Sequence, residues 1–259
     1  MSDLFIYIFS FLIGACVGSF LNVCIYRIPA HKSIVYPGST CPICQTPIKF
    51  YDNIPILGYL ILKGRCRSCG NPIAIRYLII ETLVGLLASC VVLKFGVTFT
   101  GLIYFIFIAA LIIITFIDID HQIIPNEISL PGIAVGLVFS LFIPSLTFSN
   151  SLIGIIVGGG SLWLVATLYL LLTHREGMGF GDVKLLAMIG AFIGWEGVIV
   201  TIFAGSAIGT IVGVAAMIIN RKDMKMAIPF GPFLSIGAII YLFFGEALIS
   251  WYLFGSWKL

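Results

Sequence analysis

Charge is what this sequence has least of. Only 10% of its 259 residues are charged, whereas 60% are hydrophobic. Soluble domains carry about 25% charged residues, and a soluble fold of this length could not hide so much apolar surface from water. The scarcity of charge therefore excludes an ordinary soluble protein and predicts a chain that lies mostly in lipid. The sequence also lacks internal repeats, low-complexity tracts and a glycine-rich nucleotide fingerprint.

Apolar runs long enough to cross a bilayer follow one another along the chain. A transmembrane helix needs roughly 20 mostly apolar residues. Eight runs approach that length, and the short sixth is separated from the seventh only by residues 194–197. The eight runs cover residues 4–26, 74–93, 101–117, 128–144, 150–172, 183–195, 197–219 and 229–254. The sequence therefore predicts an all-α polytopic membrane protein with about eight transmembrane helices.

The distribution of Lys and Arg predicts how these helices are oriented. Short cytoplasmic loops collect basic residues. If the N-terminus lies outside, twelve of the fourteen Lys and Arg residues fall in or beside cytoplasmic loops, and only Lys94 and Lys258 fall outside. If the sixth and seventh spans were one helix, the basic cluster of residues 221–225 would move outside. The charge bias thus favours eight spans with both termini outside.

Two acidic segments fall on the cytoplasmic side under this topology. One is the run from Asp118 and Asp120 to Pro125, and the other is the glycine-rich run 177–184, which contains Asp182. A carboxylate at mid-membrane costs about 2.5–3.5 kcal/mol on insertion scales, so acidic residues near lipid usually have a function. Two close carboxylates in a low-dielectric site do not both ionise easily, which supplies the acid and the base for peptide hydrolysis.

Each of these aspartates also has a structural interpretation. Asp118 or Asp120 alone would suit a loop cap, and Asp182 would suit the N-cap of the sixth span. The glycines before Asp182, however, would let backbone approach a substrate strand closely, because they carry no Cβ. Two acidic sites on one side of the membrane, one of them with this glycine-rich approach, favour a catalytic role.

Two pairs of cysteines form the strongest local motif. Cys41-Pro-Ile-Cys44 and Cys66-Arg-Ser-Cys69 are CxxC pairs with 21 residues between them. Four thiolates at this spacing are typical of a closed Cys₄ structural zinc site, in which the metal supplies folding energy that a small loop lacks. Two disulfides are the alternative, which a reducing cytoplasm disfavours. We therefore divide the chain into a first transmembrane helix (1–26), a cytoplasmic Cys₄ module (27–73) and a seven-helix membrane peptidase core (74–259).

The glycine-rich run 177–184 resembles the signature of type IV prepilin peptidases, which are GxGD membrane aspartyl proteases. The segment from Asp118 to Pro125 is similar to that family's first catalytic segment, in which an Asp precedes an Ile/Leu-Pro pair by six residues. Further resemblance extends over nearly the whole chain. It includes residues 18–29, 51–55, 76–81 and 229–234.

The resemblance implies a function and assigns roles to residues. The catalytic pair would be Asp118 and Asp182, and Asp120 would be a neighbour that tunes the pair. The substrates would be prepilins or pseudopilins, whose basic leader is cut off at the cytoplasmic face of the bacterial inner membrane. Relatives with such a Cys-bearing loop commonly also methylate the new N-terminus with S-adenosylmethionine, and this cofactor rests on the resemblance alone. No nucleic-acid partner is expected.

Three other functions remain open from the residues alone. A presenilin-like protease shares the glycine and aspartate motif, but its first Asp would lie deeper in an apolar helix than Asp118. A transporter or channel would carry ionisable groups through several spans, and here the fourth, fifth and eighth offer almost none before Glu246. The third alternative is a non-enzymatic scaffold with a zinc-ribbon interaction module, for which the wild-type protein would show no activity.

Overall fold

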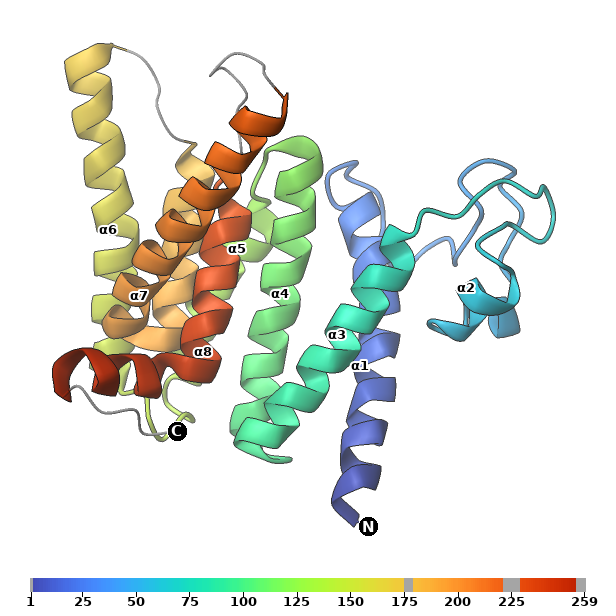
Figure 1. Cartoon of the computed structure of the whole chain (residues 1–259), viewed down its shortest axis with the longest axis horizontal. Helices are drawn as coiled ribbons and strands as arrows, with labels where there is room; N and C mark the ends of the chain where they lie inside the picture. Colours follow the sequence, from blue (N-terminus) through green and yellow to red (C-terminus); the bar gives the residue numbers. More distant parts are fainter. Residues whose placement is uncertain (1, 175–178, 221–228, 255–259) are drawn as a thin grey trace. The chain divides into compact units, whose positions relative to one another are not determined.

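The computed structural model describes residues 2–174, 179–220 and 229–254, and this part of the chain is helical. Its only β-structure is two isolated bridges, Thr40 with Pro47 and Arg65 with Pro72. The helices in Figure 1 are α1 (Ser2–Arg27), η1 (Phe50–Asn53), α2 (Leu57–Ile61), α3 (Arg76–Phe95), α4 (Phe99–His121), α5 (Asn126–Phe139), α6 (Phe148–Thr173), α7 (Phe180–Asn220) and α8 (Gly231–Phe254). The prediction of an all-α chain is confirmed.

Some predicted features lie outside the described residues. They are Gly177 and Met178 of the glycine-rich run and the basic residues Arg175, Arg221, Lys222, Lys225 and Lys258.

The helices form two compact units, Met1–Ile113 and Ile114–Leu259. Helix α4 runs through the boundary, so its last turn, with Asp118, belongs to the second unit. The functional division at residues 26 and 73 stays a prediction.

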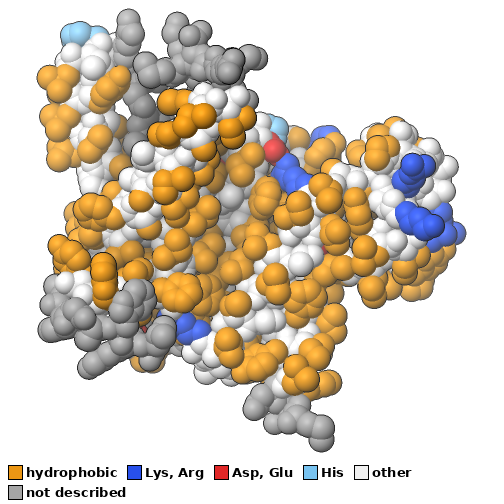
Figure 2. Space-filling view, viewed as in Figure 1, with side chains coloured by type: hydrophobic (Ala, Val, Ile, Leu, Met, Phe, Trp, Pro, Cys, Tyr) orange, Lys and Arg blue, Asp and Glu red, His pale blue; other side chains and the backbone are white. Residues whose placement is uncertain are grey.

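Six of the helices are long and apolar enough to cross a membrane: α1, α3, α4, α6, α7 and α8. Helix α5 has 14 residues and is about 21 Å long, shorter than the roughly 30 Å of hydrocarbon in a bilayer. Apolar side chains cover most of the helical surface in the space-filling view (Figure 2). The chain is therefore a multi-pass membrane protein, as its composition predicts.

Helix α7 accounts for two of the predicted spans. Its 41 residues would measure about 60 Å if straight, twice the hydrocarbon thickness. The helix is broken at Gly194, whose φ of 72° and ψ of 178° are not helical. The break lies where the sequence predicts the end of the sixth span. The part of α7 before the break is about as short as α5. Of the eight predicted spans, these two are therefore shorter than a full crossing of the bilayer.

In the first unit, α1 and α3 pack with their backbones in close contact. A Cβ added at Gly14 would lie 2.9 Å from the Cα of Gly85, and one at Gly18 would lie 2.8 Å from the Cα of Glu81. Small residues four apart allow this close packing between membrane helices. The contact holds together the two helices from which the cysteine module emerges.

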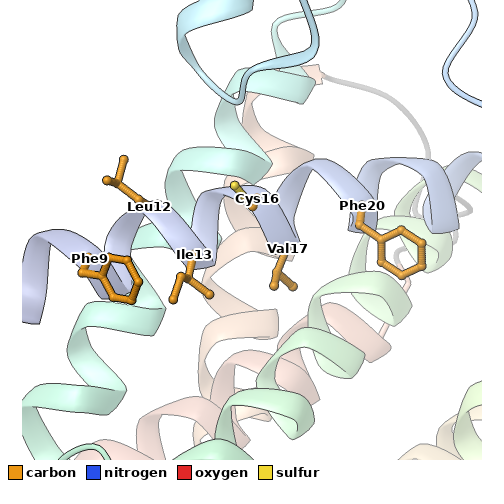
Figure 3. A pocket seen from close by; sticks show the side chains of 6 residues that line it. All are labelled: Phe9, Leu12, Ile13, Cys16, Val17 and Phe20. Carbon is orange, nitrogen blue, oxygen red and sulfur yellow. The ribbon is translucent and has the colours of Figure 1, made fainter. Parts of the chain in front are cut away.

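Helix α1 also carries an apolar hollow on its outer surface. Figure 3 shows the side chains that line it, which are Phe9, Leu12, Ile13, Cys16, Val17 and Phe20. Because no charged side chain lines it, this surface suits lipid chains and offers no catalytic group.

In the second unit, glycines bring α6 against α7. Gly154 of α6 meets Gly190 of α7, where a side chain on either residue would contact the other's backbone carbonyl. A Cβ at Gly158 would lie 2.5 Å from the carbonyl oxygen of Leu186. This packing holds the first limb of α7, which carries Asp182 in its first turn.

Candidate active site

The two predicted aspartates lie at the ends of two helices. Asp118 is in the last turn of α4 and its side chain is only 5% exposed. Asp182 is the third residue of α7 and is half-buried. The amide of Asp182 donates to the carbonyl of Gly179 (3.2 Å), so Asp182 lies in the first helical turn rather than at the N-cap. Asp182 is therefore not the N-cap residue that the structural interpretation of the sequence allowed.

The second unit brings these two carboxylates to one place. Asp118 accepts a hydrogen bond from the amide of Gly231, and both Gly231 and Gly181, the neighbour of Asp182, lie against Ile124. Ile124, which follows Asp118 after a short turn, marks the meeting point of three segments. A Cβ at Gly181 would lie 2.9 Å from the Cβ of Ile124, and one at Gly231 would lie 3.4 Å from its Cδ1. The ends of α4, α7 and α8 thus converge around the aspartate pair.

The start of α8 contributes a contact that the sequence did not predict. The backbone amide of Gly231 donates to Oδ2 of Asp118 (3.0 Å). The first amides of a helix have no partner within the helix and carry its positive dipole end, so a carboxylate is a favourable acceptor there. A Cβ at Gly231 would lie 2.6 Å from Oδ2. Glycine is therefore the residue that fits between α8 and Asp118.

Lys184 links the aspartate segment of α7 to the start of α5. Its Nζ donates to Oδ1 of Asn126 (2.7 Å) and lies 5.5 Å from the centre of the Phe180 ring. Asn126 directly follows the turn after Asp118, so this bond ties together the two acidic segments. Asp120 lies on the exposed end of α4. Two residues along a helix turn through about 200°, so Asp120 does not share the face of Asp118.

The four cysteines of the CxxC pairs form one cluster in the first unit. The Sγ atoms of Cys41, Cys44, Cys66 and Cys69 all lie within 4.8 Å of one another. The pairs Cys41–Cys69 and Cys44–Cys66 are each 3.9 Å apart. Four sulfurs around a tetrahedral zinc would be about 3.8 Å apart, given Zn–S bonds of about 2.3 Å. The cluster can hold a metal ion, and all four cysteines are free thiols rather than disulfides.

The two halves of the cysteine cluster have the same backbone geometry. The amide of Cys41 donates to Thr46 and that of Gln45 to Cys41, while Cys66 donates to Asn71 and Gly70 to Cys66. The hydroxyl oxygen of Thr46 lies 3.3 Å from the Sγ atom of Cys44. Hydrogen bonds with the hydroxyl and the backbone of Thr46 lower the pKa of the Cys44 thiol to about 6. Since a metal binds the thiolate, this environment favours the binding form.

An ion pair fixes the segment between the two halves of the cluster. Arg67 donates from Nε and Nη2 to the two oxygens of Asp52 (2.8 and 2.6 Å). These hydrogen bonds lower the pKa of the Asp52 carboxyl, whose side chain is 7% exposed. Arg67 stands between Cys66 and Cys69, so the pair joins η1 to the second half of the cluster.

Glu81 of α3 attaches the same segment to the helix pair. Its side chain is 7% exposed, and its Oε2 accepts a hydrogen bond from the amide of Ile56 (2.7 Å). Ile56 has a φ of 64°, which is uncommon for a β-branched residue. The bond to Glu81 compensates for this backbone strain. Nothing in the sequence predicted this contact of Glu81 with a backbone amide.

A helical membrane protein that carries two aspartates at neighbouring helix ends has the arrangement expected of a membrane aspartyl protease. Comparison with known proteins gives the family. Residues 12–95 match the bacterial peptidase A24 N-terminal domain, and residues 105–214 match the type IV leader peptidase family. The chain therefore belongs to the type IV leader peptidase family.

Curated relatives cover almost the whole chain. It is 34% identical to the prepilin leader peptidase/N-methyltransferase of Aeromonas hydrophila over 94% of this chain and 92% of that protein. Proteins of the same name from Pseudomonas aeruginosa and Neisseria gonorrhoeae are each 36% identical, over 93% of this chain and 91% and 93% of their own lengths. No solved structure matches the chain.

Proposed function

We propose that this chain is a membrane aspartyl endopeptidase that removes the leader from prepilins or pseudopilins, with Asp118 and Asp182 as its catalytic pair. The observation that supports this most directly is the convergence of the two carboxylates at the ends of α4 and α7. The family and the names of the relatives support the reaction and the substrate class.

The chemistry requires one proton to be shared between the two carboxylates. Two carboxylates this close do not both ionise easily, so one is available as a base and the other as an acid. The ionised aspartate takes a proton from water, whose oxygen attacks the scissile carbonyl. The protonated aspartate polarises that carbonyl, and a proton passes to the departing amine as the C–N bond breaks.

The surrounding backbone prepares the pair for this reaction. The amide of Gly231 holds Asp118 in one orientation through Oδ2. Before Asp182, Gly179 leaves the backbone open to a substrate strand because it carries no side chain, whereas the missing side chain of Gly181 makes room for Ile124. A fixed carboxylate beside an accessible backbone suits an extended peptide.

The charge pattern and the relatives support an orientation and a membrane for this chain. We place the aspartate pair on the cytoplasmic side of the bacterial inner membrane, where most Lys and Arg fall. The basic leader of a prepilin would then stay on the side from which it is removed. This side is also the reducing one that four free cysteines require.

The Cys₄ module, residues 27–73, has a structural part in this proposal. Cys41, Cys44, Cys66 and Cys69 fit a zinc ion by number, chemistry and spacing. Bound zinc would join the two halves of the loop, which has little apolar core of its own. The remaining residues 74–259 would then form the peptidase core.

A second activity is supported by the names of the relatives. Those proteins are named N-methyltransferases as well as leader peptidases. We propose that this chain likewise transfers a methyl group from S-adenosylmethionine to the amine that cleavage exposes. No residue of the chain is assigned to this second reaction.

The structure weighs against the rival functions. Asp118 lies in the last turn of α4 rather than deep within it, unlike the first Asp expected of a presenilin-like protease. A transporter would use ionisable groups along several spans, whereas the pair described here gathers at helix ends. A scaffold would need no carboxylate pair near lipid, where it is costly.

The test is cleavage of a prepilin by purified protein in proteoliposomes, with and without S-adenosylmethionine, measured by mass spectrometry. Asp118→Asn and Asp182→Asn should abolish cleavage while leaving membrane insertion intact. Asp120→Asn is the matched control and should retain activity with at most a changed pH profile. Normal cleavage by either of the first two variants would contradict the catalytic assignment, and total loss in the control would point to Asp120 instead.

A further inference from the structure

The short helix α2 presents an apolar face that no part of the first unit covers. Leu57, Leu60 and Ile61 are 54%, 56% and 67% exposed. Residues three and four apart lie on one face of a helix. The opposite side of α2 is packed, because Gly58 is buried and its Cβ position contacts the carbonyl of Asp52 in η1. The outward face of α2 is thus wholly aliphatic.

A further exposed apolar side chain and several basic residues stand near α2 in the sequence. Phe50 of η1 is 86% exposed, the highest value among the large apolar side chains described. We call Phe50, Leu57, Leu60 and Ile61 the α2 face. Lys49 stands next to it at one end, and Lys63 and Arg65 follow α2 at the other. In the sequence, basic residues therefore stand on both sides of the four α2-face residues.

The cysteine module as a whole is electropositive. Between Arg27 and Arg76, inclusive, the chain has seven Lys and Arg residues and a single acidic residue, Asp52. Asp52 is already paired with Arg67. Figure 2 shows Lys and Arg side chains gathered on this part of the surface beside apolar ones. Such a surface repels a basic peptide and attracts an anionic one.

The position of α2 along the helix pair fits the edge of a bilayer. Ile56, directly before α2, is hydrogen-bonded to Glu81, the sixth residue of α3. Glu81 lies five residues after the first residue of α3, which corresponds to a rise of about 7.5 Å along the helix axis. The start of α2 is therefore level with a point about 7.5 Å along α3 from its N-terminus. Figure 1 shows α2 beside the α1–α3 pair. Interfacial helices bury their apolar faces about 5–10 Å into the headgroup and acyl boundary.

We propose that η1 and α2 lie in the headgroup layer of an anionic phospholipid bilayer, with the α2 face turned toward the acyl chains. Lys49, Lys63 and Arg65 would then meet lipid phosphates. An apolar face with flanking cations is the pattern that binds anionic membrane surfaces. Both ends of the module are joined to helices long enough to cross the membrane, so this surface is always within reach of the bilayer. The contact would hold the cysteine module flat against the membrane.

The first experiment measures whether the α2 face touches lipid. Phe50→Trp and Leu60→Trp are made in the full chain and reconstituted in nanodiscs of phosphatidylcholine with or without phosphatidylglycerol. The added tryptophan emission, relative to the unmodified protein, should be quenched by brominated acyl chains, and more strongly in the anionic discs. Ser68→Trp, at an exposed position between Cys66 and Cys69, is the matched control and should not be quenched.

Each result decides the proposal. Unquenched emission at both α2-face positions would overturn it and indicate that protein covers the face. Equal quenching in neutral and anionic discs would overturn the role of the anionic headgroups. Because a tryptophan could disturb folding, hydrogen exchange of residues 57–61 in the unmodified protein provides a second test. Exchange should slow when phosphatidylglycerol is added, and Lys49→Gln with Lys63→Gln should remove that slowing. Exchange that does not respond to the lipid would also overturn the proposal.

Discussion

Replacing Gly231 with alanine should impair catalysis without impairing the fold. The new Cβ would lie 2.6 Å from Oδ2 of Asp118, closer than a carbon can approach a carboxylate oxygen. Gly231 does not have a positive φ, so alanine suits the backbone itself. The carboxylate is the end of a side chain and will move, which breaks the 3.0 Å hydrogen bond from the Gly231 amide.

The size of the effect follows from that bond. A hydrogen bond to a charged group contributes about 1.5–3 kcal/mol. Each 1.36 kcal/mol lost from transition-state stabilisation is a tenfold decrease in rate. Gly231→Ala should therefore lower kcat/KM for a prepilin by about 10- to 150-fold, if the orientation of Asp118 matters fully in the transition state. The decrease should fall on kcat rather than KM, because the contact is with the carboxylate that we propose to be catalytic.

The assay is single-turnover cleavage in proteoliposomes, with thermal unfolding measured on the same samples. Gly237→Ala, further along α8, is the matched control. Its Cβ would lie 2.6 Å from the carbonyl oxygen of Thr201, so it disturbs packing without touching Asp118. Gly237→Ala should lower Tm while the folded protein still cleaves. Wild-type kcat in Gly231→Ala, with a normal Tm, would refute the idea that this amide positions Asp118.

Three further predictions concern the neighbouring contacts. Cys41→Ser should release bound metal in elemental analysis, whereas the same change at a cysteine within α1 should not; retained metal would contradict the Cys₄ site. Lys184→Met should lower cleavage up to about tenfold, and adding Asn126→Ala should cost nothing more; additive losses would show that the bond between them is unimportant. Arg67→Gln should raise the pKa of Asp52 toward its usual value. Because the folded-state pKa is depressed, the pair stabilises the module above about pH 4 and this is lost on acidification, so hydrogen exchange in η1 should differ between variant and wild type only at the higher pH.

The sequence predicted well what depends on neighbouring residues. The break in α7 could be placed at Gly194 because a glycine there interrupts an apolar run too long for one span. The cysteine cluster followed from the CxxC spacing. The fourth predicted span was drawn to residue 144, whereas α5 ends at Phe139. After Phe139 the chain continues in tighter turns, in which the amides of Leu141 and Phe142 donate to the carbonyls of Val138 and Phe139, and Pro144 follows them.

Contacts between segments that are distant in the chain could not be predicted from the sequence. The bond between Gly231 and Asp118 joins residues 113 apart and exists only because α8 packs with its first turn on the end of α4. Likewise, the partner of Glu81 is a backbone amide of Ile56, and no side-chain pattern reveals a backbone donor. The proximity of Asp118 and Asp182 could be predicted from the sequence, because both were expected at the ends of spans on the same side of the membrane.

The glycine contacts between α6 and α7 have a consequence for how this protein tolerates change. Gly154 and Gly190 touch with no side chain between them, and the limb of α7 that contains Gly190 carries Asp182 in its first turn. A methyl group at either glycine would push two backbones apart and displace the whole limb as a rigid rod. Inactivating substitutions in a genetic screen would accumulate at such inconspicuous positions, two helical turns or more from any reacting atom.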